Sequence, residues 1–409
     1  MSETLQLGET ETPAREVEPP KRRSRLAMLK RLSDVVSLPS SRVNTFERSV
    51  TADLLVEILR DAEFEERARV ARRISALAEI PNCLVRLLLR DELDIAYPLL
   101  VDSVALSDTD LIDCARNATG AHRRLIAQRR GLSEVVSESL VELGETLVVE
   151  ALLRNDLARL SPTAIELVVA MTQHQGQLVP MLLRRPELRP NHAYVLFWWA
   201  DADARRVILQ RFAVSREVLQ EAAGDVFPMA AAEGWQDALT RKALQFIERR
   251  QRNRAAIERS PFSSLDEAIT VAEEGLTRDV AEEIAHLAGI KPMTGAKIMT
   301  DPGGEGLAVL CKATGLPRAS LRSLWRALRR PETDEAGEIS PELARVSMIY
   351  DMIAVDRAQT VLRYWNWSLS SAMTPALIKA IRDDDDAAVD EFSAPQRAAK
   401  LALGADLKR

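Results

Sequence analysis

The most regular charged pattern in the sequence is a row of arginines on one predicted helix. They recur at every fourth residue, which places their guanidinium groups along one face: Arg318, Arg322, Arg326 and Arg330. Like charges this close together repel, so the row favours an anionic partner. The surrounding segment 310–324 also fits a helix-turn-helix template, in which an arginine-rich second helix enters the major groove of DNA.

The competing interpretation is a repeat surface that faces solvent or a protein partner. The Gly-Leu-Pro break at 315–317 resembles the Gly-Ile-Lys-Pro break at 289–292, where the following helix is hardly basic. A repeat accounts for both breaks, whereas a DNA-binding motif accounts for only one. We therefore favour a repeat surface that faces solvent or a protein partner and keep nucleic-acid binding as the alternative.

A second basic cluster lies near the N-terminus, among the apolar residues Leu26, Leu29 and Leu32. Its members are Lys21, Arg22, Arg23, Arg25, Lys30 and Arg31. Basic and apolar residues mixed in this way are typical of a short amphipathic helix that contacts anionic lipid or an acidic partner. The other interpretation, which we favour, is a solvated tail that becomes helical only at its end.

Residues that could support catalysis are scattered along the chain. The four histidines share no metal-ligand spacing and no nucleophile motif occurs, so we expect no metal, no cofactor and no enzymatic activity. The glycine-rich segment 301–306 lacks the Gly-Lys-Ser/Thr of a phosphate-binding loop, and its predicted role is a tight turn between helices. A helical-repeat enzyme is kept as the second alternative, with Asp201, Asp203 and Asp301 as the carboxylates to test.

The elements that must position these residues are helices. Residues 107–155 read as three short helices, each with pairs of apolar residues three to four positions apart, such as Val148, Val149, Leu152 and Leu153. A short helix cannot bury such a stripe alone, so neighbouring helices must stack on it. The pattern predicts an all-α fold, a HEAT-like α-solenoid. Leu-Leu-Arg at 88–90, 152–154 and 182–184 indicates a repeat of about 32 residues.

A longer-range repeat indicates two related lobes. Segment 277–301 matches segment 67–91 without a gap at an offset of 210 residues, with seven identities, among them Ile74/Ile284 and Asp91/Asp301. Most of the matching positions lie at helical spacing, so a buried stripe recurs. The predicted domains follow from these patterns. They are a disordered basic tail at 1–48, a helical lobe at 49–235, a charged linking helix at 236–261, a second lobe at 262–331, and a C-terminal helix with an acidic tail at 332–409.

The composition sets limits on the class of protein. The net charge of −6 argues against binding nucleic acid with the whole surface, and a hydrophobic content of 46% is enough for a buried core. Three widely separated cysteines are typical of reduced core thiols. No apolar run approaches the ~18 residues needed to span a bilayer, and the N-terminus lacks the apolar stretch of a signal peptide. We therefore expect a cytoplasmic protein.

Several of these segments resemble a known family. Ser107-Asp-Thr-Asp-Leu-Ile112, His122, Ile126-Ala127-x-Arg129 and Leu152-Leu153-x-Asn155 are similar to the bacterial domain-of-unknown-function family 2336, found mainly in alphaproteobacteria. Phe197-Trp198-Trp199 and the segment 304–316 are similar to later parts of that family. The resemblance implies an all-α repeat fold in a bacterial cytosol, and it carries over no catalytic residue. It includes His122 and Asn155, which we expect to brace helix ends.

Together these observations predict a non-enzymatic adaptor or regulator. Its expected partner is another protein, bound along the surface that successive helices of a solenoid form. Nucleic acid bound through Arg318–Arg330 is the first alternative, and peripheral contact of the basic N-terminal segment with an anionic membrane is a further possibility.

Overall fold

The structure is a computed structural model that describes residues 20–39, 41–214, 218, 254–371, 373–383, 385, 392 and 394–407. Apart from one isolated bridge between Thr333 and Ile339, these residues form helices and their connections. The chain divides into two compact units, unit 1 (Met1–Leu160) and unit 2 (Ser161–Arg409). The all-α array agrees with the predicted α-solenoid. Among the described helices, none is long and apolar enough to cross a membrane.

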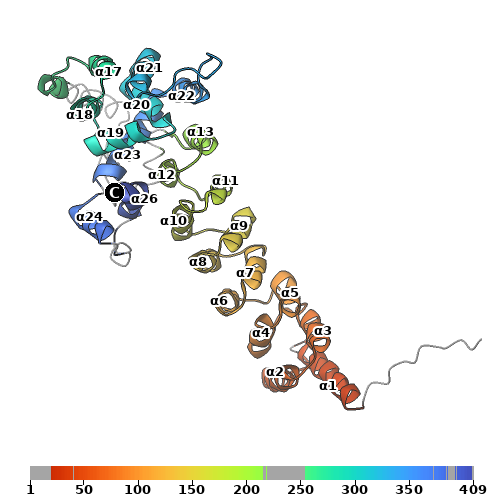
Figure 1. Cartoon of the computed structure of the whole chain (residues 1–409). Coiled ribbons are helices and arrows are strands. Elements are labelled where there is room, and N and C mark those ends of the chain that lie inside the picture. The colour runs from red at the N-terminus through yellow and green to blue at the C-terminus, as the bar shows by residue number, and fades with distance from the viewer. Residues whose placement is uncertain are drawn as a thin grey trace, which may run out of the picture. The chain divides into compact units, whose positions relative to one another are not determined.

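Unit 1 consists of one N-terminal helix, α1 (Pro20–Val36), followed along the chain by two layers of helices. Figure 1 shows the layers as two rows. The first layer contains α2 (Thr45–Arg60), α4 (Asn82–Leu89), α6 (Asp108–Asn117) and α8 (Glu134–Glu142). The second layer contains α3 (Phe64–Ile74), α5 (Leu93–Asp102), α7 (Gly120–Ala127) and α9 (Thr146–Arg154). Each helix packs on its neighbours within the layer, so the apolar stripes become buried.

The repeat in unit 1 is shorter than predicted. Helices α4, α6 and α8 begin 26 residues apart, and α7 and α9 keep the same spacing in the other layer. The predicted period of about 32 residues is wrong. That period is based on the three Leu-Leu-Arg copies. Two of these copies lie at the C-terminal ends of α4 and α9, which belong to different layers, so they do not mark equivalent positions.

Short polar side chains start the helices of unit 1. Asn44 accepts a hydrogen bond from the backbone of Glu47, whose carboxylate accepts one in return from Asn44, and Ser107 and Asp110 form the same pair at α6. The structure also differs from the predicted start of order near residue 49, because α1 packs on α2 and α3. Apolar residues at helical spacing, Leu29 and Val36, are buried in that contact. Residues 1–19 of the predicted tail lie outside the described residues.

Side chains of later helices close the ends of earlier ones. Arg129 donates to the backbone carbonyl groups of Leu100 and Ser103 at the end of α5. Asn155 donates to the carbonyl groups of Ala127 and Arg129 at the end of α7, at 2.9 and 2.6 Å. The last carbonyl groups of a helix lack partners within it, so these bonds join successive repeats and satisfy the helix ends.

Unit 2 is built around α20 (Glu305–Thr314), whose side chains are almost all buried. It packs on α19 (Pro292–Thr300), α21 (Arg318–Ala327), α22 (Pro341–Met352) and α23 (Val355–Asn366). The other elements of unit 2 are α10 (Pro162–Met171), η1 (Gly176–Leu178), α11 (Val179–Leu182), α12 (Pro190–Leu196), α13 (Ala202–Arg211), α17 (Leu265–Glu274), α18 (Arg278–Leu287), η2 (Trp367–Ser371), α24 (Pro375–Arg382) and α26 (Ala394–Leu407).

An aromatic cluster joins two of these helical regions, which lie far apart in the sequence. The buried ring of Trp365 lies 4.7 Å from the ring centre of Phe197 and 4.8 Å from that of Trp198. Its indole Nε1 donates to the backbone carbonyl of Tyr194 at 3.1 Å, so its polar atom is satisfied inside the core. The cluster therefore packs α12 and the residues after it against α23.

The division of the chain falls at a place that the sequence did not indicate. It lies at Leu160/Ser161, inside the predicted lobe 49–235, and the predicted end of that lobe lies outside the described residues. Most of the predicted linking helix 236–261 also lies outside them. Unit 2 contains both the predicted second lobe, 262–331, and the predicted C-terminal region, 332–409.

Candidate functional site

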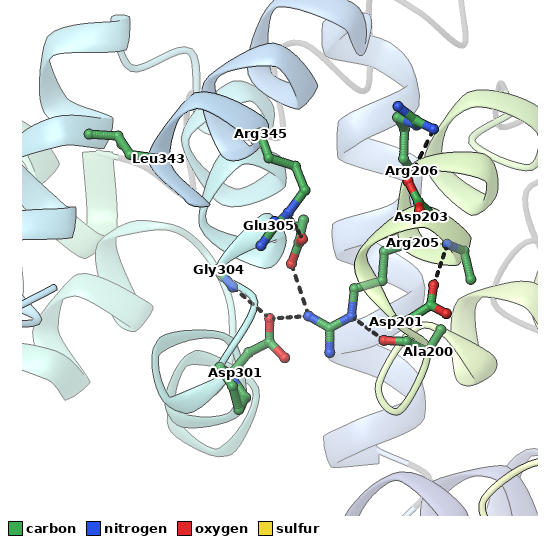
Figure 2. A network of polar contacts seen from close by, with 12 residues as sticks. Ala200, Asp201, Asp203, Arg205, Arg206, Asp301, Gly304, Glu305, Leu343 and Arg345 are labelled. Atoms are coloured by element: carbon green, nitrogen blue, oxygen red, sulfur yellow. Dashed lines mark hydrogen bonds and ion pairs between the residues drawn. The ribbon is translucent and has the colours of Figure 1, made fainter. Parts of the chain in front are cut away.

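A buried network of charged side chains surrounds Arg205 of α13 in unit 2 (Figure 2). One guanidinium nitrogen of Arg205 lies 2.7 Å from the Asp301 carboxylate and 3.0 Å from the Glu305 carboxylate. The Nε of Arg205 donates to the carbonyl of Ala200 at 2.9 Å. On the other side, Arg345 of α22 donates to Glu305 at 2.9 Å. The network thus ties α13 and α22 to the start of α20.

The network balances its own charge. It holds two carboxylates and two guanidinium groups, and Arg205, Asp301 and Glu305 are almost completely buried. Burial alone would lower the pKa of Arg205, but the carboxylates of Asp301 and Glu305 raise it above its ordinary value. Arg205 therefore stays charged in the core, where losing one partner would leave an uncompensated charge.

The turn before α20 is shaped by two glycines between Asp301 and Glu305. Gly304 has a left-handed backbone conformation, φ +79°, and its N–H donates to the Asp301 carboxylate at 3.1 Å. A Cβ at Gly304 would lie 2.6 Å from side-chain atoms of Trp325 and Arg330. The structure therefore confirms the predicted tight turn at 301–306.

The three carboxylates proposed for catalysis do not form one site. Asp201 accepts the Ala204 N–H at 2.8 Å as the N-cap of α13, and the exposed Asp203 pairs with Arg206 at 3.1 Å. Asp301 is the buried one, and it is held by Arg205. A general acid or base must reach a proton of its substrate, and none of these three carboxylates shares a site with another. No cluster of metal-ligating side chains occurs in the part of the chain that the structure describes.

The predicted arginine row does not form one continuous cationic face. Arg318 pairs with Asp351 at 3.1 Å, and Arg326 lies 3.3 Å from Glu273 and 3.6 Å from Glu332. Arg330 turns inward instead, packs over the Trp325 ring and donates to the backbone carbonyl groups of Pro302 and Asp301. Burial lowers its pKa, against the opposing effect of Asp301. Arg322 is exposed on α21.

The predicted N-terminal basic cluster lies on α1, and its members have different environments. The guanidinium of Arg25 pairs with the buried carboxylate of Glu66 at 3.0 Å, whereas Lys30 and Arg31 are exposed. The side chains of Lys21, Arg22 and Arg23 lie outside the described residues.

Two polar residues of the predicted pattern brace the turns of unit 1. The Nε2 of His122 lies 3.1 Å from the carbonyl of Asp91, and its Nδ1 lies 2.8 Å from the Thr119 hydroxyl. A carbonyl only accepts, so Nε2 carries the proton and Nδ1 accepts from the hydroxyl. Burial lowers the pKa of His122, which favours this neutral form. Like Asn155, His122 holds neighbouring repeats together.

The sequence did not single out a further group of residues, on the second layer of unit 1. Tyr97 and Val101 of α5 are 49% and 45% exposed, and Leu147 of α9 is 61% exposed. Helix α7 begins 27 residues after α5, so Arg124 of α7 is equivalent to Tyr97. An open groove of about 350 Å³ lies between α7 and α9, lined by Arg124, Gln128, Leu147, Glu150, Ala151, Arg154 and Asn155. We call Tyr97, Val101 and the residues of this groove the α5/α7/α9 surface.

A signal for this surface exists in the sequence. Ile95, Ala96, Leu99 and Leu100 form the buried stripe of α5, and Tyr97 and Val101 are apolar positions four residues apart outside that stripe. Large apolar residues on the polar face of an amphipathic helix are the pattern to search for.

The family comparison covers most of this architecture. A family model described as an uncharacterised protein conserved in bacteria (DUF2336) matches residues 95–363, which is more than half of the chain. The chain belongs to this family. The DUF2336 region begins in α5 and ends in α23, so it includes the Arg205 network and the α5/α7/α9 surface and leaves α1 to α4 outside. No curated protein and no solved structure matches the chain.

Proposed function

We propose that this DUF2336 protein is a non-enzymatic adaptor or regulator of the bacterial cytosol. Its α5/α7/α9 surface binds an amphipathic helical segment of a partner protein. The observation that carries the proposal is the exposure of Tyr97 and Val101 on α5 and of Leu147 on α9, two helices of one layer that both pack on α7. Apolar side chains that are clustered and exposed mark interaction surfaces, and tyrosine is enriched in them.

The groove between α7 and α9 gives this surface its shape. It lies between two neighbouring helices, so side chains of a partner helix spaced three or four residues apart can follow it. Its lining is largely polar and it is open to solvent, which suits the flank of a protein interface better than an enclosed substrate pocket.

The charges around the groove define the partner further. Arg154 lies 3.3 Å from Glu150, so much of its charge is already compensated. Arg124 is exposed on α7 beside Leu147 in the groove lining. We therefore expect the partner helix to carry apolar residues against Tyr97, Val101 and Leu147 and an acidic residue against Arg124.

Site-specific photocrosslinking in the native cell tests the proposal. Tyr97 is replaced by the photoreactive aromatic p-benzoylphenylalanine, and the matched control carries the same probe at Val135, which is 63% exposed on α8 of the other layer. We expect one defined protein to be crosslinked at 97 and not at 135, because only the α5/α7/α9 surface faces the partner.

Two results would contradict the proposal. Equal capture of the same proteins at both positions would show that the surface has no selectivity. Recovery of nucleic acid instead, lost at high salt and in an Arg322→Glu variant, would favour the nucleic-acid alternative, because phosphate contacts weaken steeply as salt rises. Arg322 is the residue to change, since Arg318 and Arg326 are paired and Arg330 packs inside the fold.

A further inference from the structure

Helix α1 has the composition of a membrane-surface helix. The sequence has six basic residues between Lys21 and Arg31 and no acidic residue between Pro19 and Ser33. Leu26, Leu29 and Leu32 are interleaved with them. Basic residues flanking an apolar stripe suit the interface of an anionic bilayer, where the charges meet lipid phosphates and the stripe enters the headgroup region.

Helix α1 packs incompletely on α3. An open pocket of about 330 Å³ lies between the two helices, lined among others by Leu26, Leu29, Ser33, Glu66 and Val70. The Ser33 hydroxyl and the Glu66 Oε1 atom are buried and have no hydrogen-bond partner among the described residues. Their residues are only 2% and 3% exposed. Buried polar atoms without partners and empty volume both weaken a helix contact.

Among the residues that the structure describes, two ion pairs join α1 to α3. The guanidinium of Arg25 lies 3.0 Å from the Glu66 carboxylate, and Arg73 pairs with Asp34 in a partly exposed contact. The buried Nε atom of Arg25 has no hydrogen-bond partner within the part of the chain that the structure describes. The contact of α1 with α3 therefore rests on the ion pairs of Arg25 and Asp34, with an open pocket between the two helices, whereas Leu29 and Val36 give α1 a buried apolar contact with unit 1.

We propose that α1 is a releasable helix that binds anionic phospholipid surfaces. In the observed state Lys30 and Arg31 are exposed and Leu29 and Val36 are buried against unit 1. On the membrane, α1 leaves α3, its apolar stripe enters the interface and its basic residues face lipid phosphates. Release exposes Ser33 and Glu66 to water, which satisfies the atoms that lack partners. The DUF2336 match covers residues 95–363, so α1 lies outside the matched region, as do α2 to α4.

The apolar stripe decides between a bilayer and other anionic partners. Nucleic acid would use the charges of α1 and leave Leu26, Leu29 and Leu32 without a partner, whereas a bilayer interface accommodates both kinds of side chain. An acidic protein is the other candidate, and it becomes an outcome of the test below.

Vesicle flotation with the full-length chain tests this proposal. The vesicles are phosphatidylcholine alone or phosphatidylcholine with about a third phosphatidylglycerol. We expect binding only to the anionic vesicles, and we expect the double variant Lys30→Glu/Arg31→Glu to weaken it by at least about tenfold. The control Arg86→Glu/Arg116→Glu makes the same charge change at exposed positions of α4 and α6, and it should leave vesicle binding unchanged.

A third variant tests release. Glu66→Gln removes the ion pair with Arg25 but keeps a side chain that can cap α3, so the fold is retained. We expect it to bind anionic vesicles more tightly than the unaltered chain, by about threefold or more, because α1 leaves more easily. Equal loss of binding in the α1 variant and its control would overturn the proposal, as would unaltered binding in Glu66→Gln. An acidic protein that displaces the vesicles from α1 would assign the helix to a protein partner instead.

Discussion

Two turns of the molecule, one in each unit, show the same device in different surroundings. Asp91 follows α4 and Asp301 follows α19, and the two residues are 210 positions apart in the repeat seen in the sequence. The Asp91 carboxylate accepts from Arg67 at 2.8 Å and that of Asp301 from Arg205 at 2.7 Å. The backbone carbonyl of each accepts from a later side chain, His122 or Arg330.

The two turns differ in what surrounds the pair. The side chain of Asp91 is 13% exposed, and its partner Arg67 also contacts the exposed Glu92. The side chain of Asp301 is 2% exposed, and its partner Arg205 also contacts the completely buried Glu305. In unit 1 water can replace a lost partner, whereas in unit 2 it cannot. The Asp91 turn therefore joins neighbouring repeats, whereas the Asp301 turn stabilises the core of unit 2.

The largest effect should come from breaking the buried turn. Asp301→Ala leaves Arg205 with one carboxylate fewer in the core, and we expect unit 2 to lose about 3–5 kcal/mol of unfolding free energy. Urea unfolding followed by tryptophan fluorescence measures it, because all six tryptophans of the sequence lie in Ser161–Arg409. The double variant Arg205→Met/Asp301→Leu removes both charges and should recover part of the loss. A loss below about 1 kcal/mol in Asp301→Ala would contradict the comparison.

The equivalent change in unit 1, Asp91→Ala, should lower the free energy of unfolding by less than Asp301→Ala does. Asp91→Ala removes one carboxylate from Arg67, which keeps Glu92 and access to water, so we expect a loss of about 1.5 kcal/mol. Hydrogen exchange of peptides from α4 to α7 measures it, since unit 1 has no tryptophan. A cost as large as that of Asp301→Ala would mean that burial does not distinguish the two turns.

The stability that His122 contributes at the Asp91 turn should depend on pH. Burial lowers the pKa of His122 below its ordinary value of 6.5, so the unfolded chain takes up the proton first as pH falls. Unit 1 should therefore lose stability on acidification, beginning near the unfolded value of about 6.5 and continuing towards the lower folded pKa. Hydrogen exchange at about pH 7.5 and about pH 5.5 checks it. His122→Gln should lose this part of the pH dependence, and an unchanged profile would rule out the assignment.

The smallest effect should come from the surface of unit 2. Arg318 and Asp351 are each about half exposed, so their contact is screened by water and salt. Arg318→Gln should change the unfolding free energy of unit 2 by no more than about 0.5 kcal/mol. The tryptophan fluorescence assay used for Asp301→Ala measures it under the same conditions. A larger loss would place Arg318 among the residues that support the core.

The sequence was sufficient for features that depend on local spacing. The apolar pairs of 148–153 predicted a buried helix face, and Val148, Val149, Leu152 and Leu153 are buried in α9. The polar residues His122 and Asn155 were expected to brace helix ends, and both do so. These predictions hold because helical periodicity and the needs of helix ends are set by neighbouring residues.

Features that depend on distant residues could not be predicted. Arg205 pairs with Asp301, which lies 96 residues further along the chain, and the local sequence around either residue does not indicate this partner. The spacing of Arg330 continues the row of Arg318, but α21 ends before Arg330 and its side chain contacts the Asp301 turn. Tyr97 and Val101 stand out locally as apolar residues outside the buried stripe of α5, but the packing of α7 between α5 and α9 depends on distant residues.

The measurement that tests the central claim most directly is the affinity of the crosslinked partner for two variants of the full chain. Leu147→Glu places a charge on the α5/α7/α9 surface, and Val135→Glu places the same charge at a position of equal exposure on the other layer. The account predicts that Leu147→Glu weakens binding by at least about tenfold, equivalent to about 1.4 kcal/mol, and that Val135→Glu leaves it unchanged. Equal affinities for the two variants would contradict it.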